Sequence, residues 1–185
     1  MRSRGGIGVF SAPAVAWALA VLALALTREP LASEPLAPPA DQTVCSPNGL
    51  YCAVMDAETK QTTVLREGRP HWQRSGWFRD AFLADDGEHL VVGYRGLDLL
   101  NWDYRPGTVL LSFWRRDRLI RAVPFAEVIE EPARLRPMAG HFLWGRTLGF
   151  DKSGRFTVET VEDRRLTFDI TTGALVAVEP HPFRR

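Results

Sequence analysis

A polar tetrapeptide that ends in glycine occurs three times in the chain, and a run of β-branched or aromatic residues follows each copy. The copies are residues 46–49 (SPNG), 84–87 (ADDG) and 151–154 (DKSG). Glycine accepts a positive φ at no steric cost, and Asp, Asn and Ser side chains bond back to the turn backbone. Each copy therefore predicts the turn of a β-hairpin. The chain is expected to be mainly β, as an antiparallel meander or small sandwich of hairpin units.

The three turns resemble the S-P-D-G-type turn of β-propeller blades in the WD40 and TolB-like families. Residues 168–173 (FDITTG) are similar to the end of such a blade, where an aromatic-Asp strand precedes a T-G turn. Gly49 and Gly87 are 38 positions apart, near the period of about 40–45 residues in WD40 blades, whereas Gly154 follows after 67 positions and implies an insertion. A closed propeller needs at least four blades, for which the chain is too short. The resemblance implies blade-like hairpin units that do not close into a ring.

Three longer segments are similar to an uncharacterised family of exported bacterial proteins. They are residues 45–54 (CSPNGLYCAV), 77–91 (WFRDAFLADDGEHLV) and 144–151 (WGRTLGFD). This resemblance implies no activity.

Two further strands and one helix are expected between the second and third turns. Residues 109–114 (VLLSFW) and 119–123 (LIRAV) predict a pair of strands with a short charged connection. Pro124 stands at a favourable helix start, and apolar residues after it recur at i, i+3 and i+4, so a short helix is expected until Pro132 ends it. Residues 135–145 then predict a long connection.

The N-terminus matches the pattern of an export signal. Arg2 and Arg4 supply a positive start, and residues 9–26 carry no charge and consist mostly of Ala, Leu and Val. Residues 23–25 (ALA) offer a cleavage site, but a run of this length also approaches the roughly 20 residues that cross a membrane. A cleaved signal and a retained apolar anchor helix both stay open. Both place the rest of the chain outside the cytoplasm, so we expect a periplasmic or secreted protein that meets a membrane only through an uncleaved N-terminal segment.

Composition divides the chain into four parts. Residues 1–33 form the signal peptide or membrane anchor, and residues 34–42 form a proline-rich linker, because proline fixes φ and removes donors. Residues 43–180 are expected to fold as one β-rich domain, which suits a segment of this length. Residues 181–185 form a short tail.

The only two cysteines, Cys45 and Cys52, flank the first turn. A metal site would need further ligands and a catalytic thiol a partner histidine, and neither lies close in sequence. A disulfide needs an oxidising compartment and two Cβ atoms within reach, which export and the bend supply. If Asn48 and Gly49 alone form the turn, the cysteines face each other; if residues 46–49 form a type I turn with a glycine bulge, they are offset by one. A disulfide is predicted with either geometry.

Charge excludes one class of partner, and motifs offer no chemistry. With a formal net charge of +1, the chain lacks the basic face that nucleic-acid binding requires. The sequence contains no GxSxG, SxxK, HExxH or P-loop motif, so no catalytic residue, metal ligand or cofactor is assigned. The densest polar cluster, residues 85–89 (DDGEH), has two interpretations, a cation or acid–base site and a solvated turn. The turn is favoured because turns select these residue types.

Tryptophan and histidine supply the candidate binding residues. His71 precedes Trp72 and His141 lies close to Trp144, so these two segments are candidates to meet at one end of a sheet. Exposed tryptophans stack on sugar rings or anchor protein partners, whereas buried ones fill a β core, and the core interpretation is favoured for most of them. The candidate ligand-binding residues are His71, Trp72, Trp77, His141 and Trp144.

Three functions stay open on these observations. The leading hypothesis is a non-enzymatic exported module, in the envelope or secreted, that acts through contacts with an unidentified partner such as another envelope protein. The alternative is binding of a glycan or small ligand by an aromatic patch around Trp72, Trp77 and Trp144. The third is a hydrolase that uses His71 or His141 with a distant carboxylate.

Overall fold

The computed structural model describes residues 37–95 and 98–184, so the expected signal or anchor at residues 1–33 lies outside the described residues. The described part is mainly β and contains one short α-helix. Its strands are β1 (Gln42–Cys45), β2 (Tyr51–Asp56), β3 (Gln61–Arg66), β4 (Arg69–Ser75), β5 (Ala81–Leu83), β6 (His89–Gly93), β7 (Leu99–Asn101), β8 (Val109–Arg115), β9 (Arg118–Pro124), β10 (Arg136–Met138), β11 (His141–Leu143), β12 (Gly145–Phe150), β13 (Phe156–Thr160), β14 (Arg164–Phe168) and β15 (Leu175–Pro180). Its helices are α1 (Phe125–Val128) and the 3₁₀ helix η1 (Pro132–Arg134). No helix in these two ranges is long and apolar enough to cross a membrane.

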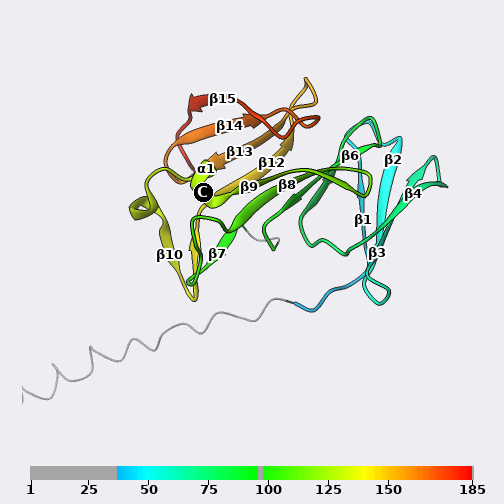
Figure 1. Cartoon of the computed structure of the whole chain (residues 1–185), viewed down its shortest axis with the longest axis horizontal. Helices are drawn as coiled ribbons and strands as arrows, with labels where there is room; N and C mark the ends of the chain where they lie inside the picture. Colours follow the sequence, from blue (N-terminus) through cyan, green and yellow to red (C-terminus); the bar gives the residue numbers. More distant parts are fainter. Residues whose placement is uncertain (1–36, 96–97, 185) are drawn as a thin grey trace, which may run out of the picture. The chain divides into compact units, whose positions relative to one another are not determined.

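The described strands form antiparallel sheets, named A to D here (Figure 1). Sheet A has the order β1-β2-β3-β4, sheet B the order β5-β6-β8-β9, and sheet D the order β12-β13-β14-β15. Sheet C is smaller and has the order β10-β11-β7. Neighbours in sheets A and D are consecutive in the chain, and sheet B differs only because β7 leaves it for sheet C. Each four-stranded sheet is thus an antiparallel up-and-down meander, and no sheet of the described residues closes into a barrel.

Sheet B lies between sheets A and D and shares a hydrophobic core with each of them (Figure 1). Met55 and Val64 of sheet A pack in one core with Leu90 of sheet B. In the other core, the ring centroid of Phe113 in sheet B lies 6.2 Å from that of Phe156 in sheet D. These side chains are fully buried, because alternate residues of a strand point to the same side. Burial of each one stabilises the fold by about 1.5–3 kcal/mol.

The three predicted glycine turns are confirmed. Residues 46–49 connect β1 to β2, residues 84–87 connect β5 to β6, and residues 151–154 connect β12 to β13. In each turn the glycine N–H donates to the carbonyl three positions earlier, at N···O distances of 2.8 to 3.0 Å. The glycine φ angles are +72°, +67° and +76°, which an L side chain rarely adopts. At Gly87 a Cβ would also lie 2.3 Å from the Tyr51 ring, so this turn needs glycine for space as well.

The predicted disulfide is present. Cys45 and Cys52 are bonded, and they stand opposite each other in the β1–β2 ladder. The turn is the four-residue one, because the Gly49 N–H donates to Ser46 O at 2.8 Å. The offset expected for that turn is nevertheless wrong. Leu50 also belongs to the loop, and the ladder resumes where the Ser46 N–H donates to Tyr51 O at 2.8 Å. This additional residue restores the register in which Cys45 stands directly opposite Cys52.

Replacing Cys45 and Cys52 together by serine is expected to lower the free energy of unfolding by about 2.5 kcal/mol. The bond closes a loop with a sequence separation of 7, and its loss releases conformations of the unfolded chain. Urea unfolding followed by tryptophan fluorescence measures the change. The wild-type chain in reducing buffer should match the double variant. A double variant as stable as the oxidised wild type would contradict the expectation.

Two expectations for the segment between sheets B and D are wrong. Helix α1 ends at Val128 and not at Pro132, because the backbone of Ile129 is already extended, with φ −114° and ψ 117°. Residues 135–145 are not a long connection, since they contain β10, β11 and the start of β12. A turn at Gly140, with φ +79°, joins β10 to β11, and β11 pairs with β7 to complete sheet C. Strands of three residues are too short to show an alternating pattern, so the sequence did not reveal them.

Residues at both ends of the described range pack on the sheets. In the proline-rich linker, the carbonyl of Ala40 accepts a hydrogen bond from Trp77 Nε1 at 2.9 Å. In the expected tail, Phe183 is buried, and its N–H donates to the Asp163 carboxylate at 2.9 Å. Contacts of the folded domain therefore extend beyond residues 43–180.

Candidate functional site: an aromatic surface on sheet C

The structure does not gather the three tryptophans of the expected aromatic patch on one face. Trp144 is 1% exposed and belongs to the core between sheets B and D. Trp72 and Trp77 are half-buried against the other core, between sheets A and B. Trp72 Nε1 donates to the carbonyl of Gly87 at 2.6 Å, which ties the ring to the second turn. Of these three tryptophans only Trp144 is buried, and Trp72 and Trp77 pack against the other core while remaining partly exposed.

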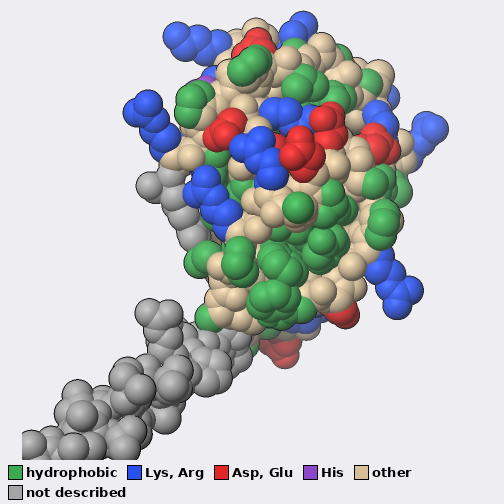
Figure 2. Space-filling model, turned by 90° about the vertical axis from the view of Figure 1, so that its left-hand side faces the viewer, with side chains coloured by type: hydrophobic (Ala, Val, Ile, Leu, Met, Phe, Trp, Pro, Cys, Tyr) green, Lys and Arg blue, Asp and Glu red, His purple; other side chains and the backbone are tan. Residues whose placement is uncertain are grey.

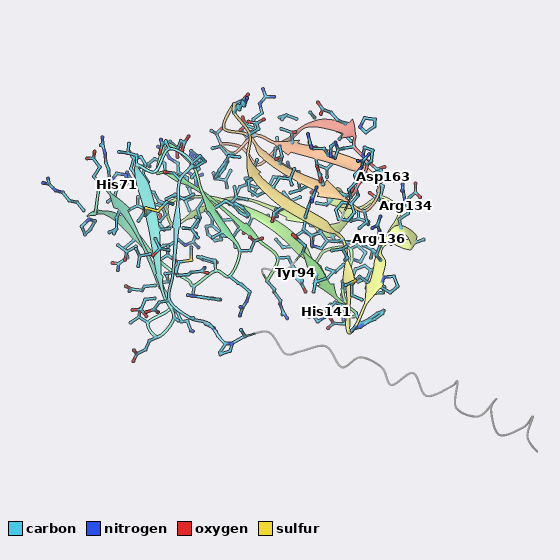
Figure 3. The ribbon with its side chains drawn as sticks, turned by 180° about the vertical axis from the view of Figure 1, so that it is seen from behind. His71, Tyr94, Arg134, Arg136, His141 and Asp163 are labelled. Atoms are coloured by element: carbon cyan, nitrogen blue, oxygen red, sulfur yellow. A yellow bond between two sulfur atoms is a disulfide. The ribbon has the colours of Figure 1, made fainter. Side chains whose placement is uncertain are left out.

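The two candidate histidines lie on different sheets and do not meet (Figure 3). His71 is exposed on β4 of sheet A, and its Nε2 lies 3.1 Å from Glu88 Oε1. His141 is half-buried on β11 of sheet C, where it pairs with Asn101 of β7.

The most exposed large hydrophobic side chain of the described residues is Trp102, at 53%. Its ring centroid lies 4.2 Å from that of Phe142, in an edge arrangement of 66°. Phe142 also meets Tyr104 edge-on at 5.8 Å, and Tyr104 packs on the buried Phe125 at 4.7 Å. A continuous row of rings thus runs from the hydrophobic core to the surface. It holds the exposed indole against a supported partner, which fixes its orientation.

Topology brings these rings together at one end of sheet C. Trp102 directly follows β7, and Phe142 pairs with the β7 residue Leu100. Met138, which is 38% exposed, pairs with His141 where β10 turns into β11. We define the aromatic surface as Trp102, Tyr104 and Phe142, whose rings are in contact. Figure 2 views the molecule from the side of β10 and shows hydrophobic side chains gathered below a band of basic and acidic ones.

Sequence reasoning did not select Trp102, although the sequence holds a signal for it. The residue stands in the polar segment 101–107 (NWDYRPG), between two expected strands. A tryptophan in a turn has no strand alternation to carry it into a core, so it tends to remain at the surface. Its partner Phe142 lies far away in the sequence, and only the pairing of β7 with β11 reveals the contact.

A buried carboxylate organises the charged side chains of sheet D. Glu159 is 1% exposed and lies 2.6 Å from Arg146, 2.8 Å from Arg165 and 2.7 Å from His181. Arg146 and Arg165 are its cross-strand partners on β12 and β14. Burial alone would raise the pKa of Glu159, but the hydrogen bonds from the two guanidinium groups outweigh burial and hold the pKa below its usual value. We name Glu159, Arg146, Arg165 and His181 the ionic cluster, and the ion pairs that join its strands give it a structural role.

A cleft of about 570 Å³ lies where the glycine turns meet, and carboxylates that line it accept hydrogen bonds from the backbone of the turns. Asp151 Oδ1 accepts the N–H groups of Ser153 and Arg155 at 2.8 and 2.9 Å. Asp86 Oδ1 likewise accepts the N–H groups of two following residues, at 2.8 and 3.0 Å, which fits the turn interpretation of residues 85–89. In residues 37–95 and 98–184, no group of three or more His, Cys, Asp or Glu side chains is placed to hold a metal ion.

Histidine–carboxylate pairs occur at three places in the described residues. His89 Nδ1 lies 2.6 Å from Asp86 Oδ2, in addition to the His71 and His181 pairs given above. Within the described chain, the hydrogen bonds of these histidines involve no hydroxyl or thiol side chain. The carboxylates therefore orient the imidazole rings of these histidines. The aromatic surface is the feature best suited to binding.

No family model and no curated protein matches the chain. Solved structures that resemble it include the β-propeller domain of Cps50 (Swd1) from Myceliophteria thermophila, at 12% identity and a TM-score of 0.40, where the match covers 78% of this chain and 42% of that chain. They also include the hydrazine synthase of Kuenenia stuttgartiensis, at 13% identity and a TM-score of 0.35, with 74% of this chain and 36% of that chain covered. The chain spans less than half the length of these solved chains. The comparisons assign it to no family.

Proposed function

We propose that the chain is an exported, non-enzymatic binding module that acts through protein contacts, with the aromatic surface as its contact surface. The observation that supports this most is the 53% exposure of Trp102, held edge-on against Phe142. Tryptophan and tyrosine dominate the binding energy of protein interfaces because they bury a large area with few rotatable bonds. A supported ring also loses little conformational freedom on binding.

The surroundings of the aromatic surface suit an interface rather than a core. Asp103 and Arg105, which flank Tyr104 in the chain, are exposed and supply a polar rim. Arginine is frequent at such contacts, since its guanidinium group binds carboxylates in two places. Exposure of a large aromatic ring on a folded domain leaves apolar surface in water, and a partner would remove it.

The proposal that the module is exported rests on two observations. The first is the basic and apolar pattern of the N-terminal residues. The second is the Cys45–Cys52 disulfide, a bond that persists in oxidising compartments. A periplasmic or secreted location agrees with both.

Replacing Trp102 by alanine is expected to weaken partner capture by about 30-fold, the effect of losing a central aromatic contact of about 2 kcal/mol. The experiment compares tagged full-length chains after brief cross-linking in the native envelope, with quantitative mass spectrometry of the captured proteins. Leu119→Ala is the matched control, because Leu119 is 45% exposed on β9, outside sheet C. Equal capture by wild type, Trp102→Ala and Leu119→Ala would refute the proposed surface.

The same surface supports a second candidate, binding of a glycan or small ligand, since an exposed indole is the platform on which sugar rings stack. Tryptophan fluorescence with a polysaccharide panel distinguishes the two candidates. A glycan-induced shift that is present in wild type and absent in Trp102→Phe would favour the glycan. If Trp102→Ala loses protein capture and the wild-type fluorescence responds to no glycan, the result would favour the protein contact.

A further inference from the structure

Another cleft, of about 410 Å³, lies at the end of sheet B where β8 turns into β9. Its lining residues are His89, Arg115, Arg118, Leu119, Ile120 and Thr171. Two of them are arginines and one is a histidine, and none of the described residues that line it carries a carboxylate. A cleft lined by one sign of charge attracts ions of the opposite sign and raises their local concentration.

The two arginines and the histidine form one row across sheet B. His89 of β6 stands directly opposite Arg115 of β8, and Arg115 stands directly opposite Arg118 of β9. Residues that are directly opposite point to the same face of a sheet, and like charges at such positions destabilise it. The row is therefore unfavourable by itself, and an anion bound across it would offset the repulsion.

The arginines of the row keep donors that an anion can use. Nε of Arg115 lies 3.9 Å from Glu88, but Arg116 binds that carboxylate at 2.7 and 2.9 Å. Arg118 is exposed and enters no ion pair among the described residues, and Asp117 before it lies in the turn and outside the lining of the cleft. Glu88 is thus bound more closely by a residue outside the row than by one within it.

His89 is the anchored member of the row. Its side chain is 11% exposed, and its Nδ1 lies 2.6 Å from Asp86 Oδ2. That contact orients the ring and leaves Nε2 as the nitrogen that can meet a ligand, to which it donates when the ring is protonated.

We propose that this cleft binds a phosphate group carried on an apolar body. A phosphate ester has a tetrahedral group with nearly two negative charges, so two guanidinium groups and an imidazole can contact its oxygens together. A carboxylate has one charge and two oxygens in a single plane. Leu119, which is 45% exposed, and Ile120 supply an apolar wall beside the row, and the cleft is larger than inorganic phosphate needs.

Isothermal titration calorimetry of the full-length chain with hexyl phosphate tests the proposal. We expect a dissociation constant of about 100 µM, as for a small ligand in an open cleft. Hexanoate has the apolar body with one charge, and inorganic phosphate has no apolar body, so each should bind about tenfold more weakly. Absence of hexyl phosphate binding would overturn the proposal, and so would equal affinity for hexyl phosphate and either comparison compound.

Two variants locate the binding. Arg118→Gln should weaken hexyl phosphate binding about tenfold, because it removes one charged donor of the row. Arg69→Gln makes the same change of net charge at an exposed position of β4 in sheet A and should bind like wild type. Equal binding by both variants would overturn the proposal.

Stability without ligand separates binding from a structural role of Arg118. In phosphate-free buffer, Arg118→Gln should unfold at a slightly higher urea concentration than wild type, because Arg115 no longer faces a like charge. A lower urea midpoint would show that Arg118 supports the fold, which would overturn its assignment to a ligand.

A lipid headgroup and a soluble phosphate ester carry the same chemistry, and a water-soluble lipid distinguishes them. If dihexanoyl phosphatidic acid binds more tightly than hexyl phosphate and Arg118→Gln weakens both, the source is a lipid. If it binds more weakly, the source is a soluble ester. Trp102→Ala should bind hexyl phosphate like wild type, so this proposal and that of the aromatic surface fail independently.

Discussion

Replacing Glu159 by alanine is expected to lower the free energy of unfolding by about 3–4 kcal/mol at pH 7. The carboxylate is 1% exposed and bonds Arg146, Arg165 and His181 within the ionic cluster. Its removal leaves the guanidinium groups of Arg146 and Arg165, on the strands to either side of β13, without a compensating charge and without the hydrogen bonds that they donate to the carboxylate. Urea unfolding followed by tryptophan fluorescence measures the loss.

The contribution of Glu159 is expected to depend on pH in a defined direction. Its pKa lies below the ordinary value of 4.5 in the folded state, so the unfolded chain binds more protons at this group. The stability it supplies is therefore present above about pH 4.5 and is lost as the pH falls through the lowered pKa. A second variant, Glu159→Gln, removes the charge and keeps the shape of the side chain. The difference in free energy of unfolding between wild type and Glu159→Gln should become smaller as the pH falls over that range.

Glu179→Ala is the matched control for Glu159→Ala. Glu179 pairs with Arg165 across β14 and β15 but is exposed, so its loss should change stability by less than about 0.5 kcal/mol. A comparable loss in both variants would show that burial of the Glu159 carboxylate does not set the effect.

The hairpins could be predicted from the sequence because their signal is local. Each turn is decided within four residues by a glycine that adopts a positive φ and by polar side chains that cap the turn. Asp151, which accepts the N–H groups of Ser153 and Arg155, is a typical case. The two strands at residues 109–114 and 119–123 were likewise marked by their own apolar pattern, and they correspond to β8 and β9.

The ionic cluster could not be predicted, because a β-bulge changes the register of its strands. An unbroken ladder counted back from the third turn would place Thr147 opposite Glu159. The ladder shifts between Thr147 and Gly149, so that Arg146 faces Glu159 instead. A shift of one residue moves side chains to the opposite face of a sheet, and no residue type in this segment announces it.

The aromatic surface was missed because its contacts are not local. Trp102 and Phe142 meet only because β7 leaves sheet B and pairs with β11. The residue pattern of one segment does not indicate that its strand leaves one sheet and pairs in another. Trp144 was selected as a candidate on its histidine neighbour, yet it lies where β11 leads into β12 and is buried by the core there. Residue type alone did not separate the buried tryptophan from the exposed one.

Replacing Asp80 by asparagine is expected to have the opposite sign and to raise the free energy of unfolding by about 3 kcal/mol at pH 7. Asp80 is half-buried, and a Cβ on Gly93 would lie 2.0 Å from its Oδ2, which shows how closely the backbone confines it. The Thr147 hydroxyl lies 3.5 Å from a carboxylate oxygen of Asp80 and from one of Asp98. Burial, and secondly the charge of Asp98, raise the pKa of Asp80 to about 6. Asparagine keeps the shape and removes the charge.

The pH dependence follows from this raised pKa. Between the ordinary value of 3.8 and about 6, the folded chain binds more protons at Asp80 than the unfolded chain does. Wild-type stability should therefore fall as the pH rises through this window, relative to Asp80→Asn, and the difference should stay constant above it. Urea unfolding at pH 4, 5, 6, 7 and 8 gives the two curves.

An exposed carboxylate separates this effect from a general change of net charge. Asp103→Asn removes one negative charge from the turn after β7, where the side chain is exposed, and should leave the pH profile unchanged. If Asp103→Asn and Asp80→Asn shift stability alike, the net charge of the domain governs both, and the confinement of Asp80 beside Asp98 has no part in it. A gain that is confined to Asp80→Asn, grows between about pH 4 and about pH 6 and stays constant above that range indicates that burial and the neighbouring charge of Asp98 raise the pKa of Asp80 in the folded chain. Glu159 and Asp80 would then be carboxylates of opposite effect: hydrogen bonds from two arginines outweigh the burial of Glu159, whereas burial and, secondly, the charge of Asp98 raise the pKa of Asp80.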